Sequence, residues 1–259
     1  MRGFARILLA AGGLRIVLLG WGSYQDQVSA VKYTDVDYFV FTDAAACLAF
    51  PASPDCSLAT GPLRNFLPLR MGDPYARDTY RYTPILAFLA LPNVLLHPIS
   101  AKLLFATADL IVGYLLYAQL LRRGIGERFA RRSVAVIWLL NPIIANISTR
   151  GSAESILGLL VVGTLVLLER GRLDAAAVLF GLAVHFKIYP VIYGSSVFVF
   201  ITRQAQLDGS KRWGGVFTAS HVRFGVLSFA TFMSLNLVMF ALYDHRQSFP
   251  ALYADTMMW

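Results

Sequence analysis

Residues 100–121 have the sequence SAKLLFATADLIVGYLLYAQLL, and the arginine-rich loop RRGIGERFARR follows at 122–132. A hydrocarbon core of roughly 30 Å needs about 20 apolar residues in one helix, so this stretch is long enough to cross a membrane. Loops rich in Lys and Arg are typical of the cytoplasmic side. The stretch therefore predicts a membrane-spanning helix whose C-terminal end faces the cytoplasm.

The composition of the whole chain agrees with this prediction. Of the 259 residues, 57% are hydrophobic and only 15% are charged, with a mean hydropathy of +0.58. A soluble domain carries about a quarter charged residues. The net charge of +8 does not indicate nucleic acid, because the basic residues lie in short runs between apolar stretches. We predict an all-α, polytopic transmembrane helical bundle that forms a single domain over residues 1–259 and has no nucleic-acid partner.

The apolar stretches divide the chain into spans and loops. Predicted spans cover 4–24, 100–121, 133–148, 153–168, 173–187, 189–202 and 222–243. The apolar stretch 83–97 contains three prolines, and we interpret it as a partly embedded helix. This topology places the N-terminus, residues 170–172 and the segment 203–213 on the cytoplasmic side. The large first loop 25–99, the turns 148–154 and 185–190 and the tail 244–259 lie on the opposite face, where most of the unusual polar residues gather.

The first loop contains the acidic pair Asp35 and Asp37, directly after the first predicted span. Paired carboxylates at this place can act as a general base, bind a metal ion, or cap the N-terminus of a helix. Capping is the ordinary function of such a pair in an arbitrary protein. The location on a membrane-bounded face gives a catalytic function equal weight.

A second cluster on the same face is Asp78-Thr-Tyr80-Arg81-Tyr82-Thr-Pro84. An arginine between two tyrosines suits a sugar or a phosphate, because guanidinium groups bind oxyanions in a forked geometry and aromatic rings stack on sugar faces. The alternative is an interfacial aromatic belt, where tyrosine is common. The cluster alone favours the belt.

Two further clusters follow later in the chain. Arg150 and Glu154 are four residues apart, so they are candidates for substrate binding or for a simple pair on one helix face. His185 and Lys187 lie in a strongly apolar context, where two such groups are costly unless they meet an anion. The alternative for Lys187 is a side chain that snorkels toward the membrane surface.

Three ionisable residues and two cysteines complete the unusual features. Arg15, Lys102 and Asp109 fall within predicted spans and must face a protein interior, a wet cavity or a partner. Cys47 and Cys56 are compatible with a disulfide in an oxidising compartment and equally with two free thiols. No CxxC motif is present, so the sequence gives no zinc or redox signature.

Several of these motifs together resemble the family of GPI mannosyltransferase I catalytic subunits. The resemblance rests on Lys32–Ala45, Pro74-Tyr75, Tyr80–Pro84, Asn141-Pro142, Arg150–Ser155 and His185–Pro190, which follow the family order along the chain. It implies a GT-C type enzyme of the endoplasmic reticulum membrane, with its active face in the lumen. It also implies transfer of the first α-1,4-mannose from dolichol-phosphate-mannose to glucosaminyl-phosphatidylinositol, and a smaller membrane accessory subunit as partner.

The resemblance places the family DxD motif on Asp35 and Asp37, which we expect to be the catalytic residues. We expect the substrates to be bound around one cavity on the lumenal face by Tyr80, Arg81, Tyr82, Arg150, Glu154, His185 and Lys187. From charge we expect His185 and Lys187, with Arg150 or Arg81, to hold the phosphate of the donor. A divalent metal is possible, although no metal ligand is assigned.

Two departures from the family pattern stand out. The stretch of roughly 50–72 is longer than usual, either as a lineage insertion or as a gene-model error, and the chain stops at Trp259 where relatives continue. Three alternatives accompany the mannosyltransferase prediction: another polyprenyl-phosphate-sugar transferase, an inactive truncated fragment, and a membrane transporter in which Arg15, Asp109 and Lys187 line a path.

Overall fold

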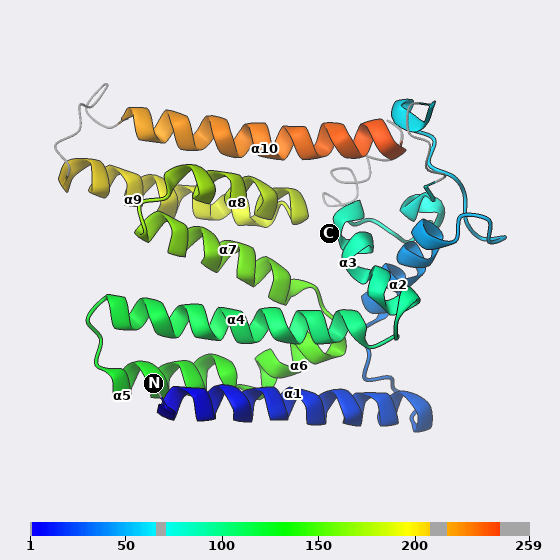
Figure 1. Cartoon of the computed structure of the whole chain (residues 1–259), viewed down its shortest axis with the longest axis horizontal. Coiled ribbons are helices and arrows are strands. Elements are labelled where there is room, and N and C mark those ends of the chain that lie inside the picture. The colour runs from blue at the N-terminus through cyan, green and yellow to red at the C-terminus, as the bar shows by residue number, and fades with distance from the viewer. Residues whose placement is uncertain (1, 66–70, 208–216, 244–259) are drawn as a thin grey trace. The chain divides into compact units, whose positions relative to one another are not determined.

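The computed structural model describes residues 2–65, 71–207 and 217–243, and these ranges are built of helices and connecting loops (Figure 1). No strand forms within them, although Leu58 and Gly72 make an isolated antiparallel bridge. The all-α prediction is therefore confirmed. The predicted tail 244–259, the centre of the extra stretch (66–70) and residues 208–213 of the predicted cytoplasmic segment lie outside the described residues.

The chain divides into two compact units, and each is described by itself. The first unit comprises residues 1–159 and 239–259, and the second comprises residues 160–238. The boundaries between the units fall inside two helices, α7 (Glu154–Glu169) and α10 (Ala219–Tyr243). The units are therefore defined by which residues pack together, and no loop or linker separates them. The prediction of a single domain stays a prediction.

The first unit contains most of the long N-terminal helices. They are α1 (Arg2–Val28), α2 (Val36–Ala49), α3 (Pro84–Leu95), α4 (Ser100–Arg122), α5 (Glu127–Val134), the π-helical segment η3 (Ala135–Leu139), α6 (Pro142–Arg150) and the beginning of α7 (Glu154–Glu169). Short 3₁₀ turns, η1 (Pro62–Asn65) and η2 (Pro74–Ala76), lie between α2 and α3. Helices α1, α4 and α6 contact one another, and α2 packs on α3. Figure 1 shows α2 and α3 beside the end of α1 and the beginning of α4.

Fewer helices reach spanning length than the sequence predicts. Within the described residues, α1, α4 and α10 (Ala219–Tyr243) are long and apolar enough to cross a membrane, and α6 with α7 forms a fourth candidate that is bent by 116°. The chain is thus a multi-pass membrane protein by length and composition. The other predicted spans are shorter helices, because breaks at Asn141-Pro142 and at the 3₁₀ turn η4 (Tyr189–Tyr193) interrupt the apolar runs.

Prolines begin two helices of the first unit instead of ending them. Pro84 follows the N-cap Thr83, whose hydroxyl accepts from Ile85 N at 3.4 Å. Pro142 follows the N-cap Asn141 in the same way, because a proline in the first turn loses no helical hydrogen bond. The predicted helix in 83–97 therefore forms, and Pro92 lies inside its last turn.

A buried ion pair joins four segments of the first unit. Arg15 in α1 contacts Asp109 in α4 at 2.6 Å, and both residues are 1% exposed. Arg15 also donates to Leu139 O at 2.9 Å, and Ser148 in α6 donates to Asp109 at 3.1 Å. Of the surroundings that the sequence left open for Arg15 and Asp109, the structure shows the protein interior. Lys102 is also turned inward, since it donates to Thr34 and is 6% exposed.

The second unit is held mainly by apolar contacts. It contains the rest of α7, α8 (Leu173–Phe186), η4, α9 (Gly194–Leu207) and α10 up to residue 238. Its core is formed by Leu168, Ala176, Ala177, Phe180, Val184, Val197, Ile201 and Phe224. Gly181 brings α8 against α10, because a Cβ at this position would lie 2.4 Å from Ser228 O.

Candidate active site

The two acidic residues of the DxD motif lie at the beginning of α2. Asp35 is the N-cap residue and Asp37 is in the first turn. Within the described chain, however, the Asp35 carboxylate accepts no capping hydrogen bond from α2. Asp35 is half-buried and Asp37 is exposed. The capping interpretation therefore explains where Asp35 lies but gives no use for its carboxylate.

Tyr82 connects this motif to the segment before α3. Its hydroxyl donates to Asp37 Oδ2 at 2.6 Å, and its ring makes an edge contact with Phe41, with centroids 4.8 Å apart. Burial raises the pKa of the Tyr82 phenol, and the hydrogen bond to Asp37 and the charges of Asp37, Asp35 and Glu154 raise this pKa further. The negative charges of three carboxylates thus favour the neutral, protonated form of this phenol. Tyr82 and Asp37 are therefore in direct contact, and the predicted substrate binding by Tyr82 stays a prediction.

Tyr80 lies beneath this contact and has a different function from Tyr82. It is 1% exposed, donates to Thr83 O at 2.6 Å and accepts from Ala87 N at 3.1 Å. Its ring lies between those of Tyr75 and Tyr82, at centroid distances of 5.6 and 5.8 Å. This geometry favours a supporting function for Tyr80 over the predicted contact with substrate. Arg81, between the two tyrosines, is exposed.

Arg150 and Glu154 do not lie on one helix face. Arg150 ends α6, Gly151 adopts φ +97°, and Glu154 begins α7. The interpretation as a pair one turn apart on a single helix is wrong, because only glycine readily adopts this φ and the chain turns there. The Arg150 Nε donates to Tyr33 O at 3.0 Å, and its carbonyl oxygen accepts from Asp35 N at 2.9 Å.

The two carboxylates of the motif have different hydrogen-bond partners, which suits them to different chemical functions. The Asp37 carboxylate is held by the Tyr82 hydroxyl. No side-chain partner of the Asp35 carboxylate is found among the described residues. A carboxylate that is fixed through its backbone and is open at its oxygens can take a proton from a bound hydroxyl group.

The described residues do not gather a ligand set for a metal ion. They contain no group of three or more His, Cys, Asp or Glu side chains arranged to hold one. Divalent cations such as Mg²⁺ are usually held by one or two carboxylates together with substrate phosphates. We therefore derive no chemical step through a metal.

A group of polar side chains behind the DxD motif joins α2 to α3 and to the start of α4, and no sequence pattern indicated these contacts. The Tyr38 hydroxyl lies 2.9 Å from Asn93 Oδ1 and 2.6 Å from Pro98 O, so its one proton is shared between α3 and the turn before α4. Asn93 also donates to Thr42 and accepts from Ala101 N. Burial raises the pKa of Tyr38 to about 12. Asn93 lies in an apolar stretch and was not predicted as a functional residue.

The extra stretch after α2 is tied to the rest of the first unit. Cys47 and Cys56 form a disulfide, which decides between the two alternatives left open by the sequence. Beyond it, Asp73 N donates to Ser57 O at 2.8 Å, and Gly61 N donates to Leu242 O at 3.1 Å near the end of α10. The described part of this stretch is therefore an integrated loop that closes on α2 and on α10.

The predicted His185 and Lys187 belong to the second unit. His185, in the last turn of α8, is 1% exposed, and its ring lies 6.4 Å from that of Phe232. Lys187 is the C-cap residue and is half-buried. Their predicted function at a shared cavity with Asp35 stays a prediction.

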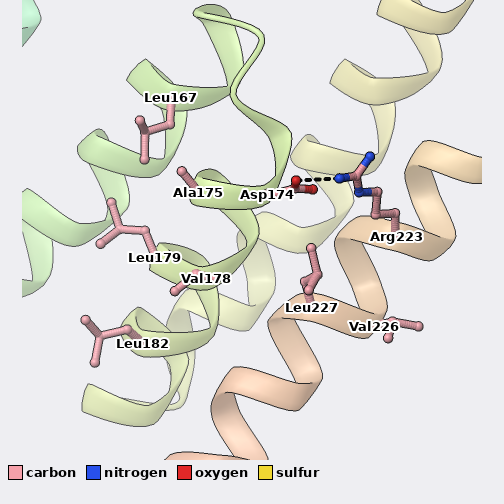
Figure 2. Close-up of a pocket in the computed structure, with 9 residues that line it drawn as sticks. All are labelled: Leu167, Asp174, Ala175, Val178, Leu179, Leu182, Arg223, Val226 and Leu227. Atoms are coloured by element: carbon pink, nitrogen blue, oxygen red, sulfur yellow. Dashed lines mark hydrogen bonds and ion pairs between the residues drawn. The ribbon is translucent and has the colours of Figure 1, made fainter.

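The second unit also contains an apolar groove along α7, α8 and α10 (Figure 2). It has a volume of about 640 Å³ and is lined by Leu167, Asp174, Ala175, Val178, Leu179, Leu182, Arg223, Val226 and Leu227. Asp174 and Arg223 form an ion pair of 2.5 Å at one end of it. This lining suits an aliphatic chain. The groove follows α8 from Asp174 to Leu182, and neither His185 nor Lys187 lines it, so it is not the predicted phosphate site.

Comparisons with known proteins identify the relatives of this chain. The family model described as "Mannosyltransferase (PIG-M)" matches residues 147–249. The chain is 44% identical over 241 residues to GPI mannosyltransferase 1 of Gibberella zeae, covering 89% of this chain and 52% of the relative. It is 42% identical to the GPI alpha-1,4-mannosyltransferase I catalytic subunit of Danio rerio, covering 90% and 54%, and 35% identical to GPI mannosyltransferase 1 of Dictyostelium discoideum, covering 90% and 51%.

The chain spans about half the length of the curated relatives that it matches. The aligned half extends over the DxD segment, the Tyr80–Pro84 segment and the end of α6, which form the site described above. By this similarity the chain belongs to the GPI mannosyltransferase 1 family.

Proposed function

We propose that this chain carries the catalytic acids of a GPI mannosyltransferase I. The reaction is transfer of the first α-1,4-mannose from dolichol-phosphate-mannose to glucosaminyl-phosphatidylinositol. The observation that supports this most directly is the pair at the start of α2, in which Asp37 is held by Tyr82 and Asp35 is open. Family membership supplies the reaction class, and this pair supplies a base.

In the proposed mechanism Asp35 accepts the proton of the acceptor 4-hydroxyl as that oxygen attacks the anomeric carbon of the donor. The bond from the anomeric carbon to the phosphate oxygen breaks, the configuration inverts, and dolichyl phosphate leaves with the bonding electrons. Asp37 and Tyr82 keep the acceptor side of the site in place. His185 and Lys187, with Arg150 or Arg81, are proposed to stabilise the charge that grows on the phosphate.

We place the site in the lumen of the endoplasmic reticulum. The Cys47–Cys56 disulfide supports this side, because disulfides persist in oxidising compartments and are rare in the cytosol. The arginine-rich loop 122–132 then lies in the cytoplasm, in agreement with the positive-inside rule. A smaller membrane accessory subunit is proposed as partner on the basis of the family resemblance.

The transporter alternative loses support from the structure. It requires Arg15 and Asp109 to line a path, but these residues are buried and paired with each other. A related polyprenyl-phosphate-sugar transferase would use the same acids, and it is distinguished only by its acceptor. The third alternative is a fragment that folds but does not transfer mannose. It is tested below, because the chain spans about half the length of its relatives.

The test is complementation of cells that lack their own GPI mannosyltransferase 1, followed by mannose transfer in their microsomes. Asp35→Asn keeps the shape of the side chain but removes the base, so we expect a fall in transfer of at least about a hundredfold at equal expression. Asp78→Asn, an exposed acid outside the proposed machinery, is the matched control. Full activity of Asp35→Asn would remove Asp35 from the base role, and no transfer by the wild-type chain would refute the proposed function.

A further inference from the structure

The DxD motif is attached to the end of α6 through its backbone. Asp35 N donates to Arg150 O at 2.9 Å, and Arg150 Nε donates to Tyr33 O at 3.0 Å. The hydroxyls of Tyr33 and Thr149 lie 2.7 Å apart. Three hydrogen bonds therefore join residues 33–35 to residues 149–150. Since the Asp35 carboxylate has no cap bond, these three bonds fix the position of the backbone that carries it.

We propose that the end of α6 is the element that positions Asp35 for catalysis, and that Thr149 and Arg150 are positioning residues. This inference rests on the proposed function, because it assumes that Asp35 is the base. It uses Arg150 for positioning, so of the two arginines proposed above for the phosphate it leaves Arg81.

Thr149 has the burial and the bonding that a positioning residue needs. It is 0% exposed, and its hydroxyl donates to Ala145 O at 2.7 Å within α6. A hydroxyl has one proton to donate, so Thr149 accepts from the Tyr33 hydroxyl. Burial raises the pKa of the Tyr33 phenol, which keeps it protonated and able to donate.

The end of α6 is itself held from the opposite side. Ser148, also 0% exposed, donates to Asp109, which is paired with Arg15. A buried charged network of this kind has few alternative arrangements, because an unpaired member would be costly in a membrane interior. The same helix end thus has a fixed support on one side and the catalytic motif on the other.

Gly151 allows the first turn of α2 to approach this helix end. It has φ +97°, and a Cβ there would lie 2.3 Å from Tyr38 Cδ2. The Tyr38 ring therefore lies directly against the backbone that ends α6. Residues 149–151 therefore contact the chain before Asp35, at Tyr33, and the chain after it, at Tyr38.

The test removes the hydrogen bond between the Tyr33 and Thr149 hydroxyls by changing each of the two residues in turn. Thr149→Val and Tyr33→Phe each delete the Tyr33–Thr149 bond with little change in shape. Thr149→Val also deletes the bond to Ala145 O within α6, for which a separate control is given below. We expect each variant to lower kcat about tenfold, with KM for donor and acceptor changed less than about twofold. The double variant should be no slower than either single variant, because both remove one interaction. Thr149→Ser keeps the hydroxyl and should restore most of kcat.

Thr164→Val is the matched control. Thr164 is buried and donates to Leu160 O at 2.9 Å within α7, as Thr149 does within α6, so this variant should keep wild-type kcat. A rise in KM for the donor with unchanged kcat in Thr149→Val would overturn the proposal, as would additive losses in the double variant.

A second measurement separates this inference from the proposed function. Hydrogen exchange of the purified full chain reports the Asp35 amide, which donates to Arg150 O. We expect faster exchange in a peptide covering residues 33–38 for Thr149→Val and wild-type exchange for Thr149→Ser, whether or not the chain transfers mannose. Unchanged exchange in Thr149→Val would overturn the positioning role while leaving the mannosyltransferase assay valid.

Discussion

The two units of this chain are stabilised in different ways. In the first unit, buried polar side chains connect helices that are far apart in sequence, as in Arg15–Asp109 and Tyr38–Asn93. In the second unit, apolar side chains form the core and glycine permits close helix contact, as at Gly181. Polar bonds have directions, whereas apolar contacts tolerate small shifts. The acids of the proposed active site lie in the unit that is fixed by polar bonds.

The largest expected effect is loss of the buried ion pair in the first unit. Arg15→Ala or Asp109→Ala leaves an unpaired buried charge, and we expect each to lower the free energy of unfolding by about 3–5 kcal/mol. Replacing both residues together, with Arg15→Met and Asp109→Leu, should cost less than either single change. Thermal unfolding of the purified full chain in detergent measures this order. A double variant less stable than both single variants would show that the pair itself stabilises the fold.

A smaller effect is expected from close packing in the second unit. Gly181→Ala places a methyl group 2.4 Å from Ser228 O, so α8 and α10 must separate locally at a cost of about 1–3 kcal/mol. Gly225→Ala in α10 meets no atom within 4 Å and is the control, with an expected gain of about 0.5–1 kcal/mol. The same unfolding measurement compares them. Equal stability of the two variants would argue against tight α8–α10 contact.

The smallest effect is expected at the exposed ion pair of the second unit. Arg223 and Asp174 lie 2.5 Å apart, but their side chains are 64% and 50% exposed. Arg223→Ala should therefore change the free energy of unfolding by less than about 1 kcal/mol. A loss as large as that of Arg15→Ala would contradict the contrast between buried and exposed pairs.

The sequence predicted the fold class because hydropathy over about 20 residues is a strong signal for a membrane helix. It did not predict how many helices reach spanning length. The run 133–148 is mostly apolar, yet Asn141 caps a new helix and Pro142 begins it, so one expected span becomes η3 and α6. Hydropathy alone does not distinguish a continuous helix from two helices joined by a cap.

The candidate site was predicted in part. Asp37 and Tyr82 are 45 residues apart, and the predicted topology brought them close together, as their hydrogen bond shows. The contact between Tyr33 and Thr149 spans 116 residues and leaves no periodicity in the sequence, so it could not be foreseen. The different surroundings of Tyr80 and Tyr82 also required the structure, because composition treats the two tyrosines alike.

The loop after the disulfide has a consequence for the order of synthesis. Gly61 N and Thr60 Oγ1 donate to the last carbonyl groups of α10, at Leu242 and Tyr243. The acceptors of these two donors therefore lie about 180 residues later in the chain. When the ribosome has made only α1 to α4, these donors are satisfied by water. The first loop can therefore complete these hydrogen bonds only after the final turn of α10 has been synthesised, and the bonds join the last helix of the described chain to that loop.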